Sequence, residues 1–312
     1  MGRPLRIHYP GAFYHITSRG NEKRAVFRNN RDRGKFLSYL QSAHERYGAI
    51  IHVYCLMDNH YHLLLETPRG NLSQILHHIN SAYTIYFNIK RRRSGHLFQG
   101  RYKAILVEKD AYCQELSRYI HLNPARSGLV NTLSAYRWSS YPSYIGSRKG
   151  PGWLTADFIL GYFGRDERSA RESYRQFVEG ALDKESRNPL KDVFASTILG
   201  TQDFISWVRE KVIQLEDPDI RNVPALRELV PSPSLDEIAR ATTSVTGKEH
   251  PLYKKFCMYV SQHHGGYALK EIGLYYGMRG SAVSQSNRRL KQSISEDPGL
   301  KKVLEKIIEK IK

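Results

Sequence analysis

The chain has 312 residues, of which 40% are hydrophobic and 25% charged, so it can form packed cores and is not disordered as a whole. Lys and Arg number 48 against 30 Asp and Glu, a formal net charge of +18. This surplus favours a polyanionic partner, with nucleic acid as the leading candidate, because basic side chains release the counterions of phosphates. A membrane surface is the alternative, but no stretch approaches the ~20 apolar residues of a spanning helix.

The N-terminus and the cysteines predict a reduced, cytoplasmic protein. Residues Met1 to Arg6 contain neither the apolar core of a signal peptide nor the Ser or Thr that myristoylation expects at position six. The cysteines Cys55, Cys113 and Cys257 are far apart and have no paired spacing. They therefore predict neither a disulfide framework nor a zinc site.

The first part of the chain, to about residue 147, alternates strand and helix patterns. The expected elements are the strand Phe13–Ser18, the helix Arg31–Tyr47, the strands Ile50–Met57 and His60–Glu66, the helix Asn71–Phe87, the strand Leu97–Val107 and the helix Asp110–Leu122. Gly48 is expected to end the first helix, Asn71 and Asp110 to cap the next two, and Asn123-Pro124 to end the last. This order is typical of an α+β fold with the ferredoxin-like arrangement.

Two boundaries divide the rest of the chain. Tyr141–Gly152 is rich in Pro, Gly and Ser, and Val230–Ser234 is a second linker. We therefore expect an α+β domain at residues 1–147, a helical linker region at 153–230 and an all-α domain at 235–312. The sequence assigns no chemistry to the middle region.

His60 and His62 are the first candidate functional residues. Side chains alternate along a strand, so these two project from one face while Tyr61 enters the other. Two imidazoles about 7 Å apart along one strand can hold a single divalent ion. The alternative is a pair of surface histidines, since the chain has 13 histidines and such a spacing also arises by chance.

Tyr119 and Asn123 are the second candidate pair. They lie four residues apart near the end of a predicted helix and so share a face. A phenolate can attack phosphorus and keep the energy of the broken phosphodiester in a phosphotyrosine, while the Asn123 amide oxygen completes a metal shell. The alternative is a core tyrosine and a helix cap. The rival nucleophiles, each on an apolar register that predicts packing, are Tyr83, Tyr86, Tyr102 and Tyr112.

Met57–Leu64, with two histidines around a bulky residue, resembles the HUH motif of single-tyrosine transposases. Gly95–Tyr102 and Tyr119–Val130 resemble two further blocks, which are typical of REP-associated tyrosine transposases. The resemblance covers roughly residues 8 to 145, with order and spacing intact. It implies a ferredoxin-like catalytic domain, Mg²⁺ or Mn²⁺, and cleavage of single-stranded DNA beside a hairpin through a 5′-phosphotyrosine.

By position, the resemblance implies that His60 and His62 are metal ligands and that Tyr119 is the nucleophile. Asn123 takes the place of an assisting polar residue that is Gln in many relatives of the insertion-sequence type, and it is the shorter side chain. Some members of the family form dimers in which the tyrosine helix serves the partner's histidines. The sequence therefore leaves open whether the protein forms a homodimer.

The C-terminal part predicts a helix-turn-helix. A short helix at Leu269–Gly277, a turn at Met278–Gly280 and a second helix at Ala282–Ile294, capped by Ser281, give this pattern. Residues 235–291 resemble the duplex-binding C-terminal domain of the replication initiator DnaA. That domain usually has Asp-His-Thr-Thr-Val at the start of its recognition helix, where this chain has Gly-Ser-Ala-Val from residue 280. The base preference of that domain therefore cannot be carried over to this chain. The alternative is a helical bundle with a basic face, and the residues expected to meet DNA are Ser281, Ser284, Gln285, Arg288 and Arg289.

A basic run follows the long helix of the first domain. It can be a solvated helix end, which such runs usually are, or it can contact the phosphates of a DNA stem. The high net charge favours the second interpretation. The candidate contacts are Lys90, Arg91, Arg92, Arg93, Arg101, Lys103 and Arg126.

The leading hypothesis is a metal-dependent transposase that cleaves and rejoins single-stranded DNA next to hairpins, while the C-terminal domain holds adjacent duplex DNA. A catalytically silent repressor that only binds DNA hairpins is the second hypothesis. A role in RNA binding or processing is the third. No membrane partner is expected.

Overall fold

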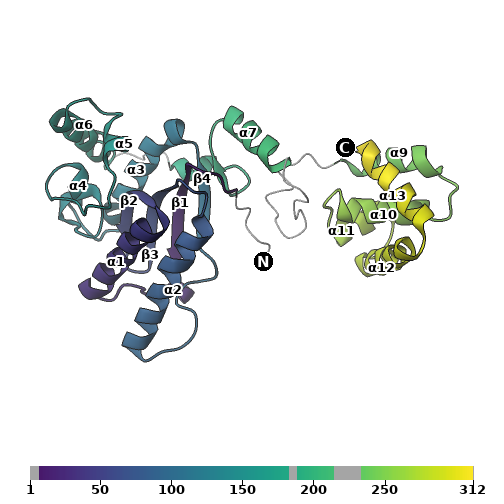
Figure 1. Ribbon diagram of the computed structural model, residues 1–312, viewed down its shortest axis with the longest axis horizontal. Coiled ribbons are helices and arrows are strands. Elements are labelled where there is room, and N and C mark those ends of the chain that lie inside the picture. Colours follow the sequence, from purple (N-terminus) through teal and green to yellow (C-terminus); the bar gives the residue numbers. More distant parts are fainter. Residues whose placement is uncertain (1–6, 183–187, 214–232, 312) are drawn as a thin grey trace. The chain divides into compact units, whose positions relative to one another are not determined.

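The computed structural model describes residues 7–182, 188–213 and 233–311, which form two compact units, residues 6–208 and 209–312 (Figure 1). The expectation that there is no signal peptide rests on Met1 to Arg6, and the second linker on Val230–Ser234. The first of these segments and residues 230–232 of the second lie outside the described residues. No helix in the described part is both long and apolar enough to cross a membrane.

A five-stranded sheet in the order β2-β3-β1-β4-β5 organises the first unit. Its strands are β1 (Ala12–Arg19), β2 (Ile50–Leu56), β3 (His60–Thr67), β4 (Lys103–Val107) and β5 (Ile198–Leu199). The first four pair antiparallel, and β5 adds to β4 in parallel. The order of the first four strands, with helices between β1 and β2 and between β3 and β4, confirms the predicted ferredoxin-like α+β fold.

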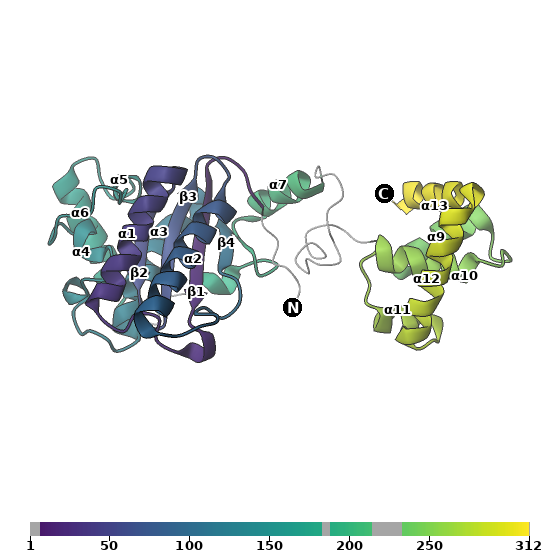
Figure 2. The same ribbon diagram turned by 60° about the horizontal axis from the view of Figure 1, so that its bottom comes forward.

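Helices cover both faces of this sheet. Figure 2 shows α1 and α2 side by side across one face, with α3 behind the strands. The α-helices of this unit are α1 (Asn30–Tyr47), α2 (Leu72–Arg91), α3 (Lys109–Arg126), α4 (Tyr141–Tyr144), α5 (Asp157–Leu160), α6 (Glu167–Glu179) and the part of α7 (Gln202–Ile213) up to residue 208. The 3-10 helices are η1 (Asn21–Lys23), η2 (Leu133–Ala135) and η3 (Pro189–Asp192).

The alternation along β3 decides which helix meets which side chain. The Tyr61 ring lies 4.8 Å from that of Phe36 on α1, and its hydroxyl donates to Asn80 of α2 at 2.8 Å. Leu64, on the opposite face, packs in one buried cluster with Ile120 of α3. His60 and His62 share the face of Leu64, so α3 covers the histidine side of the sheet.

The predicted strand at Leu97–Val107 is too long. Only Lys103–Val107 pairs as a strand, and Phe98 forms just an isolated bridge with Gly20. Gly95 and Gly100 have φ angles of 88° and 68°, in the left-handed region that interrupts an extended strand. The segment before β4 is therefore a loop.

Both predicted ends of α3 need correction. The N-cap is Glu108 rather than Asp110, and the helix runs through Pro124 to Arg126. Pro124 has no N–H for the carbonyl of Ile120, but the amide Nδ2 of Asn123 lies 3.4 Å from that oxygen and 2.8 Å from the Tyr119 carbonyl. The Asn123 side chain thus supplies donors where proline removes one.

At α2, Asn71 occupies the predicted N-cap position but makes no side-chain cap hydrogen bond.

Several elements after residue 141, namely α5, α6 and η3, pack against α3 rather than apart from it. Tyr144 and Tyr174 are fully buried in the same cluster as Leu116 and Ile120. Buried His121 of α3 joins this layer, with Nδ1 2.7 Å from the Tyr174 hydroxyl and Nε2 2.7 Å from Ser140 Oγ. This layer fixes α3, and with it Tyr119, over the sheet.

The described part of the second unit is entirely helical. Its helices are α9 (Leu235–Thr246), α10 (Tyr253–His263), α11 (Leu269–Tyr276), α12 (Gly280–Glu296) and α13 (Pro298–Ile311). Ser234 caps α9 in a reciprocal box with Glu237, and Phe256 and Leu290 lie in the central core. Gly277 ends α11 with a φ of 67°. The predicted cap at Ser281 is wrong, because Arg279 is extended and forms the N-cap of α12.

Candidate active site

Three histidines from two neighbouring strands meet beneath α3. His62 of β3 lies diagonally across from His15 of β1, with His62 Nδ1 3.0 Å from His15 Nε2 and the rings stacked at 5.3 Å. The His60 ring lies 5.0 Å from the His62 ring. The two histidines of the motif are therefore neighbours on one face, as expected, and His15 is a third member that the sequence analysis missed.

Hydrogen bonds orient the two motif histidines. His60 Nδ1 lies 2.6 Å from Oδ1 of Asn59, whose Nδ2 donates to the carbonyl of Lys23 at 3.0 Å. Because an amide oxygen only accepts, His60 carries its proton on Nδ1 and keeps the lone pair on Nε2. If His62 donates from Nδ1 to His15, its Nε2 likewise keeps a lone pair.

The donor atoms fit a divalent metal. Nε2 of His62 is buried and has no hydrogen-bond partner among the described residues, which costs free energy unless something ligates it. No group of three or more His, Cys, Asp or Glu in the described ranges is arranged for a metal. An ion held here by His60 and His62 would therefore need oxygen ligands from other sources, such as an amide, water or a phosphate.

All three histidines are neutral near neutral pH. Burial lowers the pKa of His15 to about 3. Burial, with the nearby His15 and His60, lowers the pKa of His62 well below its usual value. The pKa of His60 is lowered by burial and by Arg19, against the opposing effect of Asp58. A histidine must be unprotonated to bind a metal ion, so these histidines can bind one without first losing a proton.

Tyr119 lies over the same cluster. Its ring centroid is 6.0 Å from that of His62 and 6.2 Å from that of His15, both edge-on. The side chain is half-buried. Burial raises the pKa of Tyr119, and Arg126, whose guanidinium lies 5.8 Å from the ring, lowers it. The fold of one chain thus brings His60, His62 and Tyr119, which lie in distant segments of the sequence, close together.

Asn123 and the rival tyrosines have other surroundings. The amide nitrogen of Asn123 is bound to its own helix, and no hydrogen bond joins this side chain to the histidines among the described residues. Tyr83 and Tyr86 lie on α2, across the sheet from the histidines, where their hydroxyls donate to Val26 and Asp32. Of the tyrosines considered from the sequence, Tyr119 is the one whose ring contacts the histidine rings.

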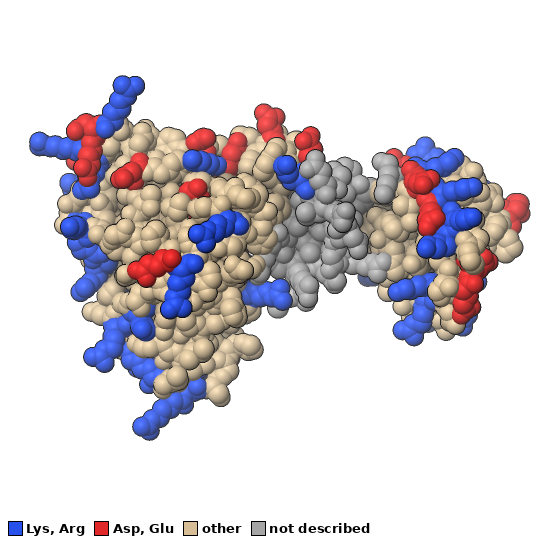
Figure 3. Space-filling view, viewed as in Figure 1, with Lys and Arg blue, Asp and Glu red and all other residues tan. Residues whose placement is uncertain are grey.

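The predicted DNA contacts fall into different environments. Lys90 and Arg91 pair with Asp32 at 2.6 and 2.8 Å, and Asp32 is fully buried. In Figure 3, Lys and Arg gather over the lower part of the first unit, where no Asp or Glu is visible. The other predicted residues are all exposed: Arg92, Arg93, Arg101, Lys103, Arg126, Ser281, Ser284, Gln285, Arg288 and Arg289.

Part of the chain is similar to known proteins. Residues 9–123 match the family model of IS200-like transposases, which confirms the resemblance seen in the motifs of this segment. Among solved structures, a REP-associated tyrosine transposase bound to a REP hairpin is similar, with 16% identity and a TM-score of 0.41 over 51% of this chain and 93% of that one. No curated protein matches the chain. Residues 9–123 thus carry the sequence pattern of IS200-like transposases.

Proposed function

We propose that this protein is a transposase that cleaves and rejoins single-stranded DNA next to hairpins, with Tyr119 as the nucleophile. The observation that carries the proposal is the 6.0 Å approach of the Tyr119 ring to His62, next to His60 in the same chain. The match of residues 9–123 to IS200-like transposases supports the same reaction class. The net charge of +18 suits a DNA substrate.

His60 and His62 would hold Mg²⁺ or Mn²⁺ through Nε2, with Asn123 Oδ1 as a further candidate ligand. When bound, the ion supplies positive charge to a phosphoryl oxygen and to the leaving oxygen. With His62 Nδ1 as the donor, His15 Nε2 accepts the proton of this hydrogen bond and the lone pair of His62 Nε2 stays free for the ion. Asn59 Oδ1 likewise accepts from His60 Nδ1, which leaves the lone pair of His60 Nε2 free.

Tyr119 performs the strand transfer. Its phenol loses a proton, and the phenolate oxygen forms a bond to phosphorus while the bond from phosphorus to the 3′-oxygen breaks and that oxygen takes up a proton. The product is a 5′-phosphotyrosine, which an incoming 3′-hydroxyl can attack in the reverse sense to rejoin DNA. Arg126, 5.8 Å from the ring, favours the phenolate.

The second unit is proposed to hold adjacent duplex DNA through α11 and α12. Along α12 the residues expected to meet DNA are exposed, while Val283, Asn287 and Leu290 are buried against the other helices. A helix with one free polar and basic face can enter a major groove. Loss of duplex binding by the full chain on replacing Arg288 and Arg289 with Gln tests this role, and unchanged binding would refute it.

The experiment that tests the proposed reaction uses single-stranded oligonucleotides with the hairpins that flank the gene. With Mg²⁺ or Mn²⁺, the wild-type protein is expected to form a covalent protein–DNA adduct, which chelation of the metal abolishes. Tyr119→Phe is expected to bind the DNA without forming the adduct, and Tyr112→Phe, on the same helix, to keep it. Tight binding with no adduct under either metal would favour the silent repressor.

A further inference from the structure

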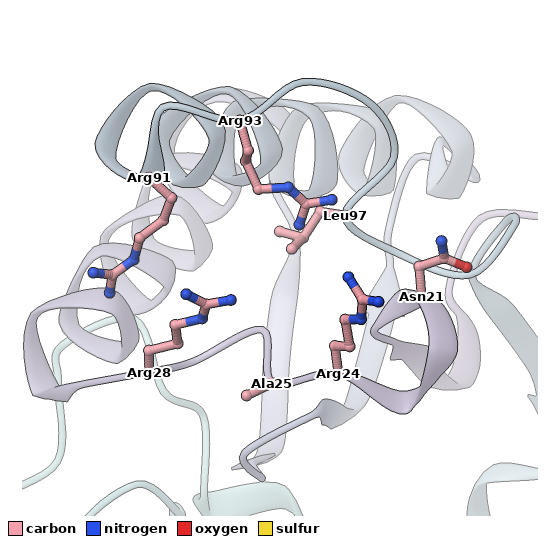
Figure 4. Close-up of a pocket in the computed structure, with 7 residues that line it drawn as sticks. All are labelled: Asn21, Arg24, Ala25, Arg28, Arg91, Arg93 and Leu97. Atoms are coloured by element: carbon pink, nitrogen blue, oxygen red, sulfur yellow. The ribbon is translucent and has the colours of Figure 1, made fainter.

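A basic pocket lies where the loop after β1 meets the end of α2 and the segment that follows it. A pocket of about 250 Å³ is lined by Arg24 and Arg28 from the loop, Arg91 and Arg93 from the other side, and Leu97. In Figure 4 the guanidinium groups of Arg24, Arg28 and Arg93 extend into the space between the two segments. Four of the seven lining residues are arginines, and none is acidic.

The two walls are held together by backbone hydrogen bonds. The N–H of Asn21 donates to the carbonyl of Leu97 across the pocket at 2.9 Å, and those of Val26 and Phe27 donate to the backbone carbonyl of Asp58, in the turn before β3, at 2.9 and 3.0 Å. The loop is therefore fixed at both of its ends. An anion that enters the pocket would meet side chains on a preformed frame, which lowers the entropic cost of binding.

The buried carboxylate of Asp32 pairs with only one of the four pocket arginines, Arg91. Asp32 already accepts from Lys90 at 2.6 Å, from Arg91 at 2.8 Å and from the backbone of Arg28 at 3.0 Å. The guanidinium of Arg28 has no ion pair among the described residues. Arg24 pairs with Glu22, but both side chains are mostly exposed, so this pair is weak and easily displaced.

Three of the cations crowd around one aromatic ring. The guanidinium carbons of Arg28, Arg91 and Arg93 lie 5.6, 5.7 and 5.9 Å from the centroid of the Phe87 ring. The ring face attracts each of them, but the like charges repel one another. A bound anion would relieve that repulsion, and the forked guanidinium donors match the oxygens of a phosphate.

The pocket loop is also linked to the candidate active site. Asn59 donates to the carbonyl of Lys23 in this loop and accepts from His60 Nδ1, so one side chain touches both. The turn Asp58-Asn59 anchors the loop and leads directly into β3. A phosphate held in the pocket would therefore position a DNA strand near the metal histidines.

We infer that Arg24, Arg28, Arg91 and Arg93 form a phosphate-binding site for the DNA strand, distinct from the phosphate that is cleaved. The inference rests on the proposed function for the identity of the strand. The phosphate is either an internal phosphodiester or a 5′-terminal monoester, and both present the same oxygens to the arginines.

The test measures the salt dependence of binding to a fluorescent hairpin oligonucleotide by the full chain. Arg28→Gln and Arg93→Gln are each expected to weaken binding and to reduce the slope of log affinity against log salt by about 0.7 to 0.9, the value for one phosphate contact. Arg168→Gln, an exposed arginine on α6, is the matched control. Slopes for Arg28→Gln and Arg93→Gln equal to that of the control would overturn the inference.

Two further arms complete the experiment. A loss seen equally on 5′-phosphorylated and 5′-hydroxyl oligonucleotides assigns an internal phosphodiester, and a loss confined to the former assigns the terminal phosphate. Adduct formation by the wild-type protein is measured in parallel. A reduced slope without any adduct would support phosphate binding in the pocket and refute the cleavage reaction. An adduct with unchanged slopes would support the reaction and refute phosphate binding in the pocket.

Discussion

Nδ1 of His62 lies 3.0 Å from Nε2 of His15, on the neighbouring strand of the sheet. This hydrogen bond ties the central histidine of the site to a residue that lies 47 positions earlier in the chain. Turning the His62 ring would break this hydrogen bond, so the His15 side chain restrains the ring orientation of His62. We therefore propose that His15 positions His62 rather than binding the metal itself.

Replacing His15 tests this relationship through metal affinity rather than activity. His15→Leu removes the acceptor but keeps the buried position apolar, and it is expected to weaken Mn²⁺ binding about 10- to 100-fold in calorimetry. His15→Gln retains an acceptor and is expected to recover part of the loss. If His15→Leu binds Mn²⁺ as the wild type does, His15 does not position His62.

The site should act within one chain. The rings of Tyr119 and His62 lie 6.0 Å apart in the same unit, so neither needs a second protein molecule. A mixture of Tyr119→Phe and His62→Ala is therefore expected to stay inactive in the adduct assay, although each retains one half of the site. Recovery of adduct in the mixture would show that the tyrosine helix serves a partner's histidines.

Asp32 is expected to be important for stability. It is fully buried at the start of α1 and receives Lys90 and Arg91 from the end of α2, so it joins the two helices. Asp32→Asn leaves two partly buried cations without their anion, which should lower the free energy of unfolding by about 3 kcal/mol in urea titration. Exposed Asp203→Asn serves as the control, with less than about 1 kcal/mol expected. Equal effects would contradict this role.

His121 should make stability depend on pH. Burial lowers its pKa to about 3, whereas in the unfolded chain it is about 6.5. Between these values the unfolded state binds a proton that the folded state does not, so stability is retained above about pH 6.5 and falls as the pH drops toward 3.

Urea titrations at pH 7.5, 6.5 and 5.5 measure this effect. His121→Gln, which can still reach Ser140 and Tyr174, should make the decline shallower by up to about 1.4 kcal/mol per pH unit. His77→Gln, on an exposed site of α2, is the control. The same pH slope for His121→Gln and the wild type would show that His121 does not cause the decline.

The sequence predicts what depends on local pattern. Alternation along one strand places His60 and His62 together, and helical spacing with Gly48 locates α1. His15 could not be singled out because its partnership with His62 depends on the register between β1 and β3, which are 40 residues apart or more. Phe13, His15 and Thr17 do share one face of a recognisable strand, which was the available signal.

Contacts that depend on distant segments were not predictable. β5 has only two residues, too few for a pattern, and it joins the sheet from nearly 100 positions after β4. The end of α3 was predicted too early because proline usually stops a helix, whereas here the side chain of Asn123 supplies the missing donor. The sequence singles out one side of the arginine pocket, the basic run at the end of α2, but only the fold places Arg24 and Arg28 of the loop after β1 opposite it.

Under the proposed reaction, Tyr119 becomes covalently attached to DNA. The most direct measurement is peptide mapping by mass spectrometry after the wild-type protein reacts with hairpin-bearing single-stranded DNA and Mn²⁺. We expect a 5′-phosphonucleotide on Tyr119 and on no other residue, and we expect it to be lost when the metal is chelated. A nucleotide on any other tyrosine, or cleavage with no covalent adduct, would contradict it.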